Sequence, residues 1–289
     1  MKKNYWWVII LFALLSSCGG RSHTDHKPIL TVTIEPLRYF TETIAGDKYK
    51  VVSMLPEGTS PETYDPTPGQ LVDLGKSQAY FRVGYIGFER AWIKKLQANA
   101  PHLLFFDTSR GVSLLKDNHT HGAKEGHMHE GVDPHIWNSP RNAAIMAENI
   151  YRALCELDQK NEAYYKHRVD SLLRQIASTD SIIRTELPAL DKAFVIYHPA
   201  LTYFAADYGL RQISIEEEGK EPSPAHLEEL IKRCKAEKVK VIFVQQEFDV
   251  RNAEVIAKEL NVKVVPINPL SYQWQKEMLG IAKALYHPL

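Results

Sequence analysis

The side chains of this sequence best suited to chemistry are its histidines, because a neutral imidazole is a common ligand of transition metals. Four of the 12 histidines fall within residues 117–130 (DNHTHGAKEGHMHE), a stretch with neither helical nor strand periodicity. They are His119, His121, His127 and His129. Such a tract is typical of an auxiliary metal-collecting loop, although a solvated loop without any ligand has the same composition. A loop fixes no coordination geometry, so we expect the ligands of the principal site elsewhere.

Three better-placed candidates lie at the ends of predicted strands or in the turns that follow them. His135 stands in the segment DPHIW directly before a predicted helix, and His198 follows a predicted strand. Glu62 stands in a turn-rich loop at residues 56–68 (PEGTSPETYDPTP). Open α/β sheets bind ligands at such positions, and two imidazoles with a carboxylate suit Zn²⁺, Mn²⁺ or Fe²⁺. Taken singly, each residue also fits a plainer role, as a capping or core-edge histidine or a solvated carboxylate.

Eight apolar runs rich in β-branched residues alternate with helical patterns along the chain. The predicted strands are residues 29–34, 50–55, 79–85 and 103–106 in the first half, and 193–197, 212–215, 239–244 and 262–267 in the second. A repeat of strand and helix predicts mostly parallel sheets that are covered by helices. The chain is therefore expected to be an α/β protein with two similar halves.

A helical stretch of different character separates these halves. Ser139 and Pro140 form a good helix start, with the helix expected to end near Leu157, and Asp158 can cap a second helix. Apolar residues then recur at spacings of three and four through residues 159–186, which predicts a helix roughly 42 Å long. A helix of that length suits a spine between two lobes. The alternative is a single (β/α)8 barrel, and the mid-chain helices argue against it.

Several motifs occur in the order found in one known family. They are PEGTSPETYDPTP, DPHIWNSP, FVIYHPALTYFAADYGL, EEEGKEPSPAHLEELI, and VKVIFVQQEF followed by VVPINPL. Through them nearly the whole chain resembles the bacterial zinc and manganese ABC-transporter solute-binding proteins of cluster A-I. The resemblance implies two (β/α)4 lobes joined by one long rigid helix, with the metal in the cleft between them. The implied division is an N-terminal lobe at 28–158, a linking helix at 159–186 and a C-terminal lobe at 187–289.

The resemblance also assigns metal ligands, residue by residue. The metal-binding histidine of the family motif DPHxW falls on His135, and that of YHxAxxYF falls on His198. The third position departs from the family, because Glu62 stands where the pattern SPHxYxPTP has a ligating histidine. Glutamate can also ligate a metal, but it makes the site richer in oxygen and weakens the preference for zinc over manganese or iron.

The fourth ligand is left open by the resemblance. Manganese-type members place an aspartate shortly after the NPL-like segment, whereas residues 271–274 here read SYQW and contain no acid. Some zinc members use water instead. Glu217, Glu221 and Glu247 lie near the edges of the lobes, but they match no family ligand, and none of the three is expected to contact the metal directly.

The first residues resemble a bacterial lipoprotein leader. Two lysines precede an apolar run at residues 5–15, and the sequence LSSC ending at Cys18 resembles the lipoprotein cleavage box. This predicts a signal peptide at 1–17, lipidation of Cys18 and a tether at 18–27. The protein is then expected in the cell envelope, lipid-anchored on the periplasmic side of a bacterial membrane. The sequence predicts no disulfide between Cys155 and Cys234, which lie on separate helical stretches.

Charge and motifs restrict the function further. Lys plus Arg and Asp plus Glu both number 35, so the chain has no net positive charge that would attract nucleic acid. The resemblance implies a monomer that is not an enzyme, captures a divalent metal, Zn²⁺ first with Mn²⁺ or Fe²⁺ as alternatives, and delivers it to an ABC permease in the inner membrane. The rival functions are a metal-dependent hydrolase and a surface adhesin-like lipoprotein that has lost the metal site. A hydrolase would be expected to carry a motif such as HExxH, which this sequence lacks.

Overall fold

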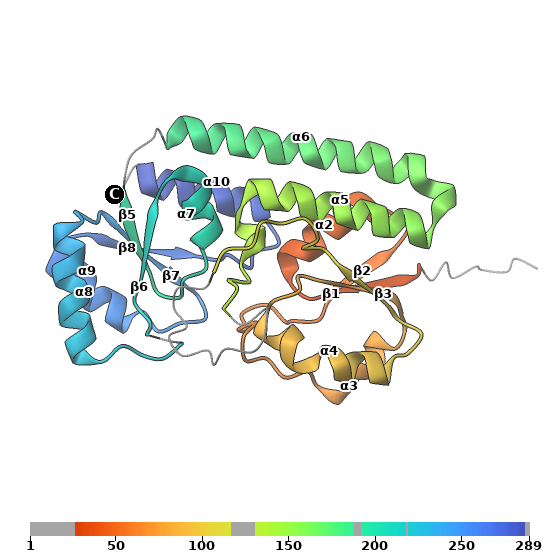
Figure 1. The fold of residues 1–289 in the computed structure, drawn as a ribbon, viewed down its shortest axis with the longest axis horizontal. Coiled ribbons are helices and arrows are strands. Elements are labelled where there is room, and N and C mark those ends of the chain that lie inside the picture. The colour runs from red at the N-terminus through yellow and green to blue at the C-terminus, as the bar shows by residue number, and fades with distance from the viewer. Residues whose placement is uncertain (1–26, 117–130, 188–191, 218, 287–289) are drawn as a thin grey trace, which may run out of the picture.

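The computed structural model describes residues 27–116, 131–187, 192–217 and 219–286. Within these ranges the strands form two separate four-stranded sheets, one in each lobe (Figure 1). The N-terminal sheet contains β1 (Ile29–Val32), β2 (Lys50–Ser53), β3 (Ser77–Arg82) and β4 (Leu104–Asp107). The C-terminal sheet contains β5 (Ala193–Ile196), β6 (Arg211–Ser214), β7 (Val241–Gln245) and β8 (Lys263–Ile267). All eight predicted strands are present, and the single-barrel alternative is excluded by the two sheets.

Both sheets are parallel and wind in the same order. The N-terminal order is β2-β1-β3-β4, and the C-terminal order is β6-β5-β7-β8. Winding of this type reverses direction between the first and third strands of each lobe, which are β1 and β3 in one lobe and β5 and β7 in the other. Open sheets bind ligands beyond the carboxyl ends of the strands at this reversal. The topology therefore directs attention to the loops that follow these four strands.

Helices follow the strands and give each lobe a (β/α)4 pattern. The N-terminal lobe contains α2 (Glu35–Ala45), α3 (Pro68–Leu74), α4 (Gly87–Asn99) and α5 (Pro140–Leu157). The C-terminal lobe contains α7 (Thr202–Tyr208), α8 (Pro224–Ala236), α9 (Arg251–Leu260) and α10 (Trp274–Tyr286). The predicted start of α5 is confirmed, because the Ser139 hydroxyl accepts a hydrogen bond from the Asn142 N–H and Pro140 occupies the first helical position.

The spine between the lobes is α6 (Glu162–Glu186), a helix of 25 residues and so about 38 Å long. It starts three residues later than predicted, because residues Gln159–Asn161 form a 3-10 turn. Asp158 precedes this 3-10 turn, but its side chain makes no capping hydrogen bond. Its carboxylate instead accepts hydrogen bonds from the Asn161 amide and the Tyr165 hydroxyl. The buried face of α6 packs against α2 and α5 of one lobe and α10 of the other, as Figure 1 shows.

Direct hydrogen bonds also join the two lobes. The Trp137 indole N–H donates to the Pro269 carbonyl at 2.8 Å, and the Trp274 indole N–H donates to the Trp137 carbonyl at 2.7 Å. The Tyr272 hydroxyl donates to the Glu42 carboxylate at 2.7 Å. Both tryptophans are buried in a core that the lobes share. These contacts favour small loop movements over wide opening of the lobes.

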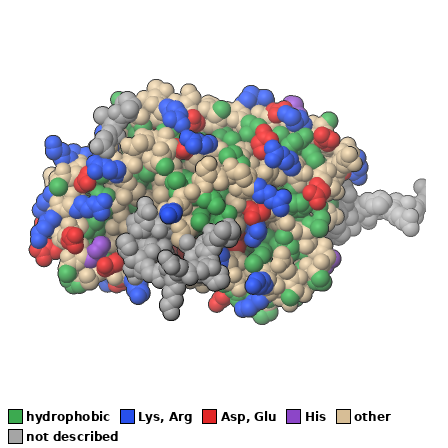
Figure 2. Space-filling model, in the orientation of Figure 1, with side chains coloured by type: hydrophobic (Ala, Val, Ile, Leu, Met, Phe, Trp, Pro, Cys, Tyr) green, Lys and Arg blue, Asp and Glu red, His purple; other side chains and the backbone are tan. Residues whose placement is uncertain are grey.

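The surface shows no large area of a single charge on the face drawn in Figure 2, where acidic and basic side chains are interspersed. Among the described residues, no helix combines the length and apolar character needed to cross a bilayer. Cys155 and Cys234 both carry free thiols. The predicted leader and tether, with Cys18, and the four histidines of the predicted metal-collecting loop lie outside the described residues.

Candidate metal centre

Two histidines from different lobes converge at the centre of the inter-lobe cleft. His135 lies in the N-terminal lobe, directly before a 3-10 turn that leads into α5, and His198 lies two residues after β5. Their Nε2 atoms are 3.2 Å apart, and their rings meet nearly edge to face. Two nitrogens bound to one tetrahedral zinc ion at 2.0–2.1 Å lie about 3.3–3.4 Å apart. The Nε2 pair therefore has the separation expected of two ligands of one ion.

A buried carboxylate lies behind each imidazole. The Asp133 carboxylate is 2.9 Å from His135 Nδ1 and also accepts from the backbone N–H of His135. The Glu216 carboxylate is 2.8 Å from His198 Nδ1. Metal-binding histidines commonly donate the N–H of the ring nitrogen that does not bind the metal to such a carboxylate, which orients the ring and raises its basicity. Both Nε2 atoms are thereby left facing the cleft.

The environment of Asp133 favours a charged carboxylate. Burial raises its pKa, but the charge and the two hydrogen bonds of His135, together with the Thr202 side chain, outweigh burial and lower the pKa below its ordinary value. Asp133 thus stays ionised and can hold His135 in one orientation.

The position of His198 is fixed by the end of β7 and the turn that follows it. The Gln245 side chain accepts from the His198 N–H and donates to the His198 carbonyl at 2.6 Å. Phe248 stacks on the His198 ring, with the centroids 5.5 Å apart and the planes 18° from parallel. The imidazole is therefore held from behind by Glu216 and on one face by Phe248.

Glu62 reaches the cleft from the loop between β2 and α3. Its Oε2 accepts a 3.0 Å hydrogen bond from the Gly87 N–H at the start of α4, where the helix dipole favours a negative charge. Its Oε1 is buried and has no hydrogen-bond partner among the described residues. A β-carbon on Gly87 would lie 2.5 Å from Oε2 and 2.7 Å from the Glu62 carbonyl, so only glycine fits there. One carboxylate oxygen is thus anchored, and the other is left for a cation.

All three predicted ligands line one small cavity. Its volume is about 30 Å³, enough for an ion with one or two waters and too small for an organic solute. Its walls come from both lobes and are formed by Ser60, Pro61, Glu62, His135, Trp137, His198, Ala200, Gln245, Glu247, Phe248, Pro269 and Leu270.

Glu247 also lines this cavity, although it was not expected to contact the metal. Glu247 lies in the turn after β7, and its Oε1 is buried without a hydrogen-bond partner among the described residues. Burial raises its pKa, although its own backbone N–H and the charge of His198 act in the opposite direction. Two acids that were set aside with it stay away from this cavity, since Glu217 lines a different one and Glu221 is exposed. The position of Glu247 in a turn shortly after a predicted strand is the sequence signal that could have indicated it.

The carboxylates of Glu62 and Glu247 do not form a compact cluster with the imidazole pair. Among the described residues, no three His, Cys, Asp or Glu side chains form a ready-made metal cluster. The imidazoles of His135 and His198 are preorganised, whereas Glu62 and Glu247 stand on the cavity wall. Rotation about the side-chain bonds of a glutamate moves its carboxylate without moving the backbone. The side chains of Glu62 and Glu247 can therefore move toward the imidazole pair.

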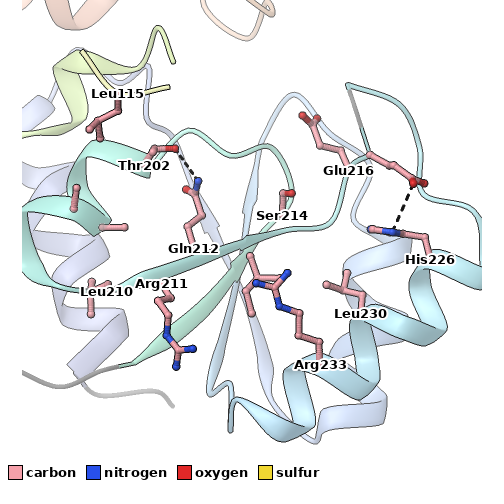
Figure 3. A pocket seen from close by; sticks show the side chains of 14 residues that line it. Leu115, Thr202, Leu210, Arg211, Gln212, Ser214, Glu216, His226, Leu230 and Arg233 are labelled. Carbon is pink, nitrogen blue, oxygen red and sulfur yellow. Dashed lines mark hydrogen bonds and ion pairs between the residues drawn. The ribbon is translucent and has the colours of Figure 1, made fainter. Parts of the chain in front are cut away.

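A larger cavity in the C-terminal lobe is separate from this cleft. It has a volume of about 680 Å³ and is lined by side chains from α7, β6 and α8 (Figure 3). His226 and Glu217 face each other there at 3.9 Å. Glu216 lines this larger cavity and bonds to His198, but His135, His198 and Glu62 line the small cavity in the cleft. We therefore place the candidate site in the cleft.

Comparison with known proteins shows which family the chain belongs to. The sequence pattern of the family described as "Zinc-uptake complex component A periplasmic" matches residues 30–285. The chain belongs to the ZnuA family. It is 30% identical to the zinc-binding lipoprotein AdcA of Streptococcus pneumoniae, over 93% of this chain and 56% of AdcA, so it spans about half of that relative. It is 28% identical to the high-affinity zinc uptake system protein ZnuA of Bacillus subtilis, over 90% of this chain and 85% of that protein.

Relatives of the ZnuA family differ in the metal that their names give. The chain is also 28% identical to the manganese ABC transporter substrate-binding lipoprotein PsaA of Streptococcus pneumoniae, over 89% of this chain and 85% of PsaA. A crystal structure of a ZnuA superimposes with a TM-score of 0.82 at 32% identity, covering 90% of this chain and 98% of that one. The predicted family and the two-lobe fold are thus confirmed.

Proposed function

We propose that this protein is the metal-binding component of an ABC importer, which captures a divalent transition metal in the inter-lobe cleft and delivers it to a membrane permease. The observation that carries the proposal is the 3.2 Å approach of His135 Nε2 to His198 Nε2 across the lobe boundary. Each imidazole has a carboxylate behind it, and the carboxylate of Glu62 lines the same cavity. These are the donors that hold zinc, manganese or iron in proteins.

Zinc is the first candidate for the cargo, with Mn²⁺ and Fe²⁺ as alternatives. Two imidazoles suit zinc, and the family description and two of the compared relatives name zinc. The carboxylate of Glu62 in place of a histidine makes the site harder, which favours manganese and iron relative to a purely imidazole site. Elemental analysis of the protein purified without added metal distinguishes the three ions.

Binding, rather than hydrolysis, is the activity that this cavity supports. A hydrolase needs an open coordination position and space for its substrate beside the metal. The cavity of about 30 Å³ leaves no such space. The adhesin-like alternative required loss of the metal site, and the imidazole pair with its two supporting carboxylates speaks against that loss.

The proposed division of labour follows the domain boundaries. Residues 28–158 and 187–289 form the two lobes that share the ion, and residues 159–186 hold them at a fixed distance. Lipidated Cys18 anchors a monomer at the periplasmic side of the membrane, close to the permease, and the histidines of residues 117–130 collect ions. The names of the relatives, which include lipoproteins of ABC metal transporters, support this placement.

Equilibrium dialysis against Zn²⁺ tests the proposal. The residue 117–130 segment is deleted in all variants so that its histidines do not contribute. One tightly bound ion per chain is expected, and His135→Ala or His198→Ala should abolish tight binding. His167→Ala, on the exposed face of α6, is the matched control and should bind like the parent protein. No tight ion in the parent, or equal losses in all three variants, would refute the proposal.

A further inference from the structure

The strand order of the C-terminal lobe places two loops side by side at the cleft. β5 and β7 are neighbours in the sheet, paired in parallel through Val195 with Ile242 and Ile196 with Phe243. Their carboxyl ends therefore meet at one edge, at the point where the winding of this lobe reverses. His198 comes two residues after β5 and Glu247 two residues after β7. The same topology that positions the imidazole thus positions a carboxylate beside it.

The turn after β7 encloses His198 from two sides. It is closed by a hydrogen bond from the Phe248 N–H to the Gln245 carbonyl. Gln245 at its start bonds to both backbone groups of His198, and Phe248 at its end stacks on the imidazole. Glu247 lies between these two contacts. Its backbone is therefore held at a fixed place relative to the imidazole that it accompanies.

Within the described residues, one oxygen of the Glu247 carboxylate has no partner that accounts for its place in the cleft. Its Oε1 is buried and unpartnered among the described residues, as is Oε1 of Glu62 on the same cavity. A buried charge without a partner is costly, so such groups usually face a cation or a ligand. Two carboxylates would balance the charge of one divalent ion, with Glu62 from the N-terminal lobe and Glu247 from the C-terminal lobe.

We propose that Glu247 is the fourth protein ligand of the transported metal, completing a site of two imidazoles and two carboxylates. This inference rests on the proposed function. Each lobe then contributes one histidine and one glutamate, and the ion draws the two carboxylates off the cavity wall.

The test is Glu247→Gln, which keeps the size of the side chain and removes its charge. Glu254→Gln, the same change at an exposed position of α9, is the control. Zinc affinity is measured by competition with a chelating dye, and the coordination sphere is followed by visible absorption of bound Co²⁺. Glu247→Gln should still bind one ion, at least ten-fold more weakly, with an altered Co²⁺ spectrum. Glu254→Gln should match the wild type in both measurements.

The outcomes separate the two proposals. If wild-type protein binds no tight ion, the proposed function fails and this inference fails with it. If wild type binds one ion and Glu247→Gln has the same affinity and spectrum, Glu247 is not a ligand. If the affinity falls while the Co²⁺ spectrum is unchanged, Glu247 acts from outside the coordination sphere and its assignment as a ligand is overturned. Thermal unfolding of both metal-free variants checks that the fold is intact.

Discussion

Trp274 of the C-terminal lobe donates an indole hydrogen bond of 2.7 Å to the backbone carbonyl of Trp137 in the N-terminal lobe. Both side chains are fully buried, and Trp137 lies two residues after His135. The indole of Trp137 donates in turn to the Pro269 carbonyl. This pair of hydrogen bonds fixes the position of His135 against the lobe that carries His198, so lobe packing and site geometry are coupled.

Trp274→Ala should lower the free energy of unfolding of the metal-free protein by about 3–5 kcal/mol, because it removes a large buried side chain and a buried hydrogen bond. Urea unfolding followed by circular dichroism measures the change. Val255→Ala, at an exposed position of α9, is the control and should change the stability by less than about 0.5 kcal/mol. Equal effects of the two substitutions would contradict the role of Trp274 in joining the lobes.

Gly87→Ala should weaken metal binding at least ten-fold, because the new β-carbon would overlap both the Glu62 carboxylate and its backbone carbonyl. The matched control is Gly280→Ala in α10, where a β-carbon would meet nothing within 4 Å. That change should leave affinity unaltered and stabilise the helix by about 0.5–1 kcal/mol. Isothermal titration with Zn²⁺ measures both variants. A Gly87→Ala variant that binds like wild type would show that Glu62 has no part in holding the ion.

The buried carboxyl of Glu89 should make stability fall as the pH rises. It accepts hydrogen bonds from the N–H groups of Val83 and Gly84 and from the Thr33 hydroxyl, yet burial raises its pKa from 4.5 to about 7. Between these values the folded protein keeps a proton that the unfolded chain has lost. The stability that this proton confers is complete below pH 4.5 and disappears as the pH passes 7, a change of about 3 kcal/mol.

Urea unfolding of metal-free wild type and Glu89→Gln at pH 5 and pH 8 tests this. The difference in free energy between the two proteins should shift by about 2.5 kcal/mol between these pH values, with wild type losing more, because part of the contribution of this proton is already lost at pH 5. Parallel pH profiles would show that Glu89 does not titrate differently in the folded and unfolded states.

Deletion of residues 117–130 should leave the tight site intact. Lys116 and Val132 pair in an antiparallel bridge, so the flanks of the segment already lie together and can be joined by a short linker. Zinc affinity at equilibrium should be unchanged, while loading from a dilute zinc solution, followed by stopped-flow fluorescence, should slow. Loss of the tight site would show that the histidines of this segment are principal ligands.

The sequence was sufficient to predict the two lobes, all eight strands and the residues of the imidazole pair, because strand periodicity and motif spacing are local properties. Details that depend on contacts between distant segments could not be predicted from the sequence. β3 ends at Arg82 rather than at residue 85, since Gly84 adopts a positive φ and binds Glu89. The anchoring of Glu62 by Gly87 joins residues 25 positions apart. Glu247 follows a predicted strand, but only the sheet order, which places β7 beside β5, shows that this position lies next to His198.

A crystal structure of the zinc-loaded protein, with anomalous scattering recorded at the zinc edge, is the most direct measurement. We predict one strong peak in the cleft, within about 2.0–2.2 Å of the Nε2 atoms of both His135 and His198 and of a Glu62 carboxylate oxygen. A peak elsewhere in the molecule, or one that touches the side chains of a single lobe, would contradict an ion shared between the lobes.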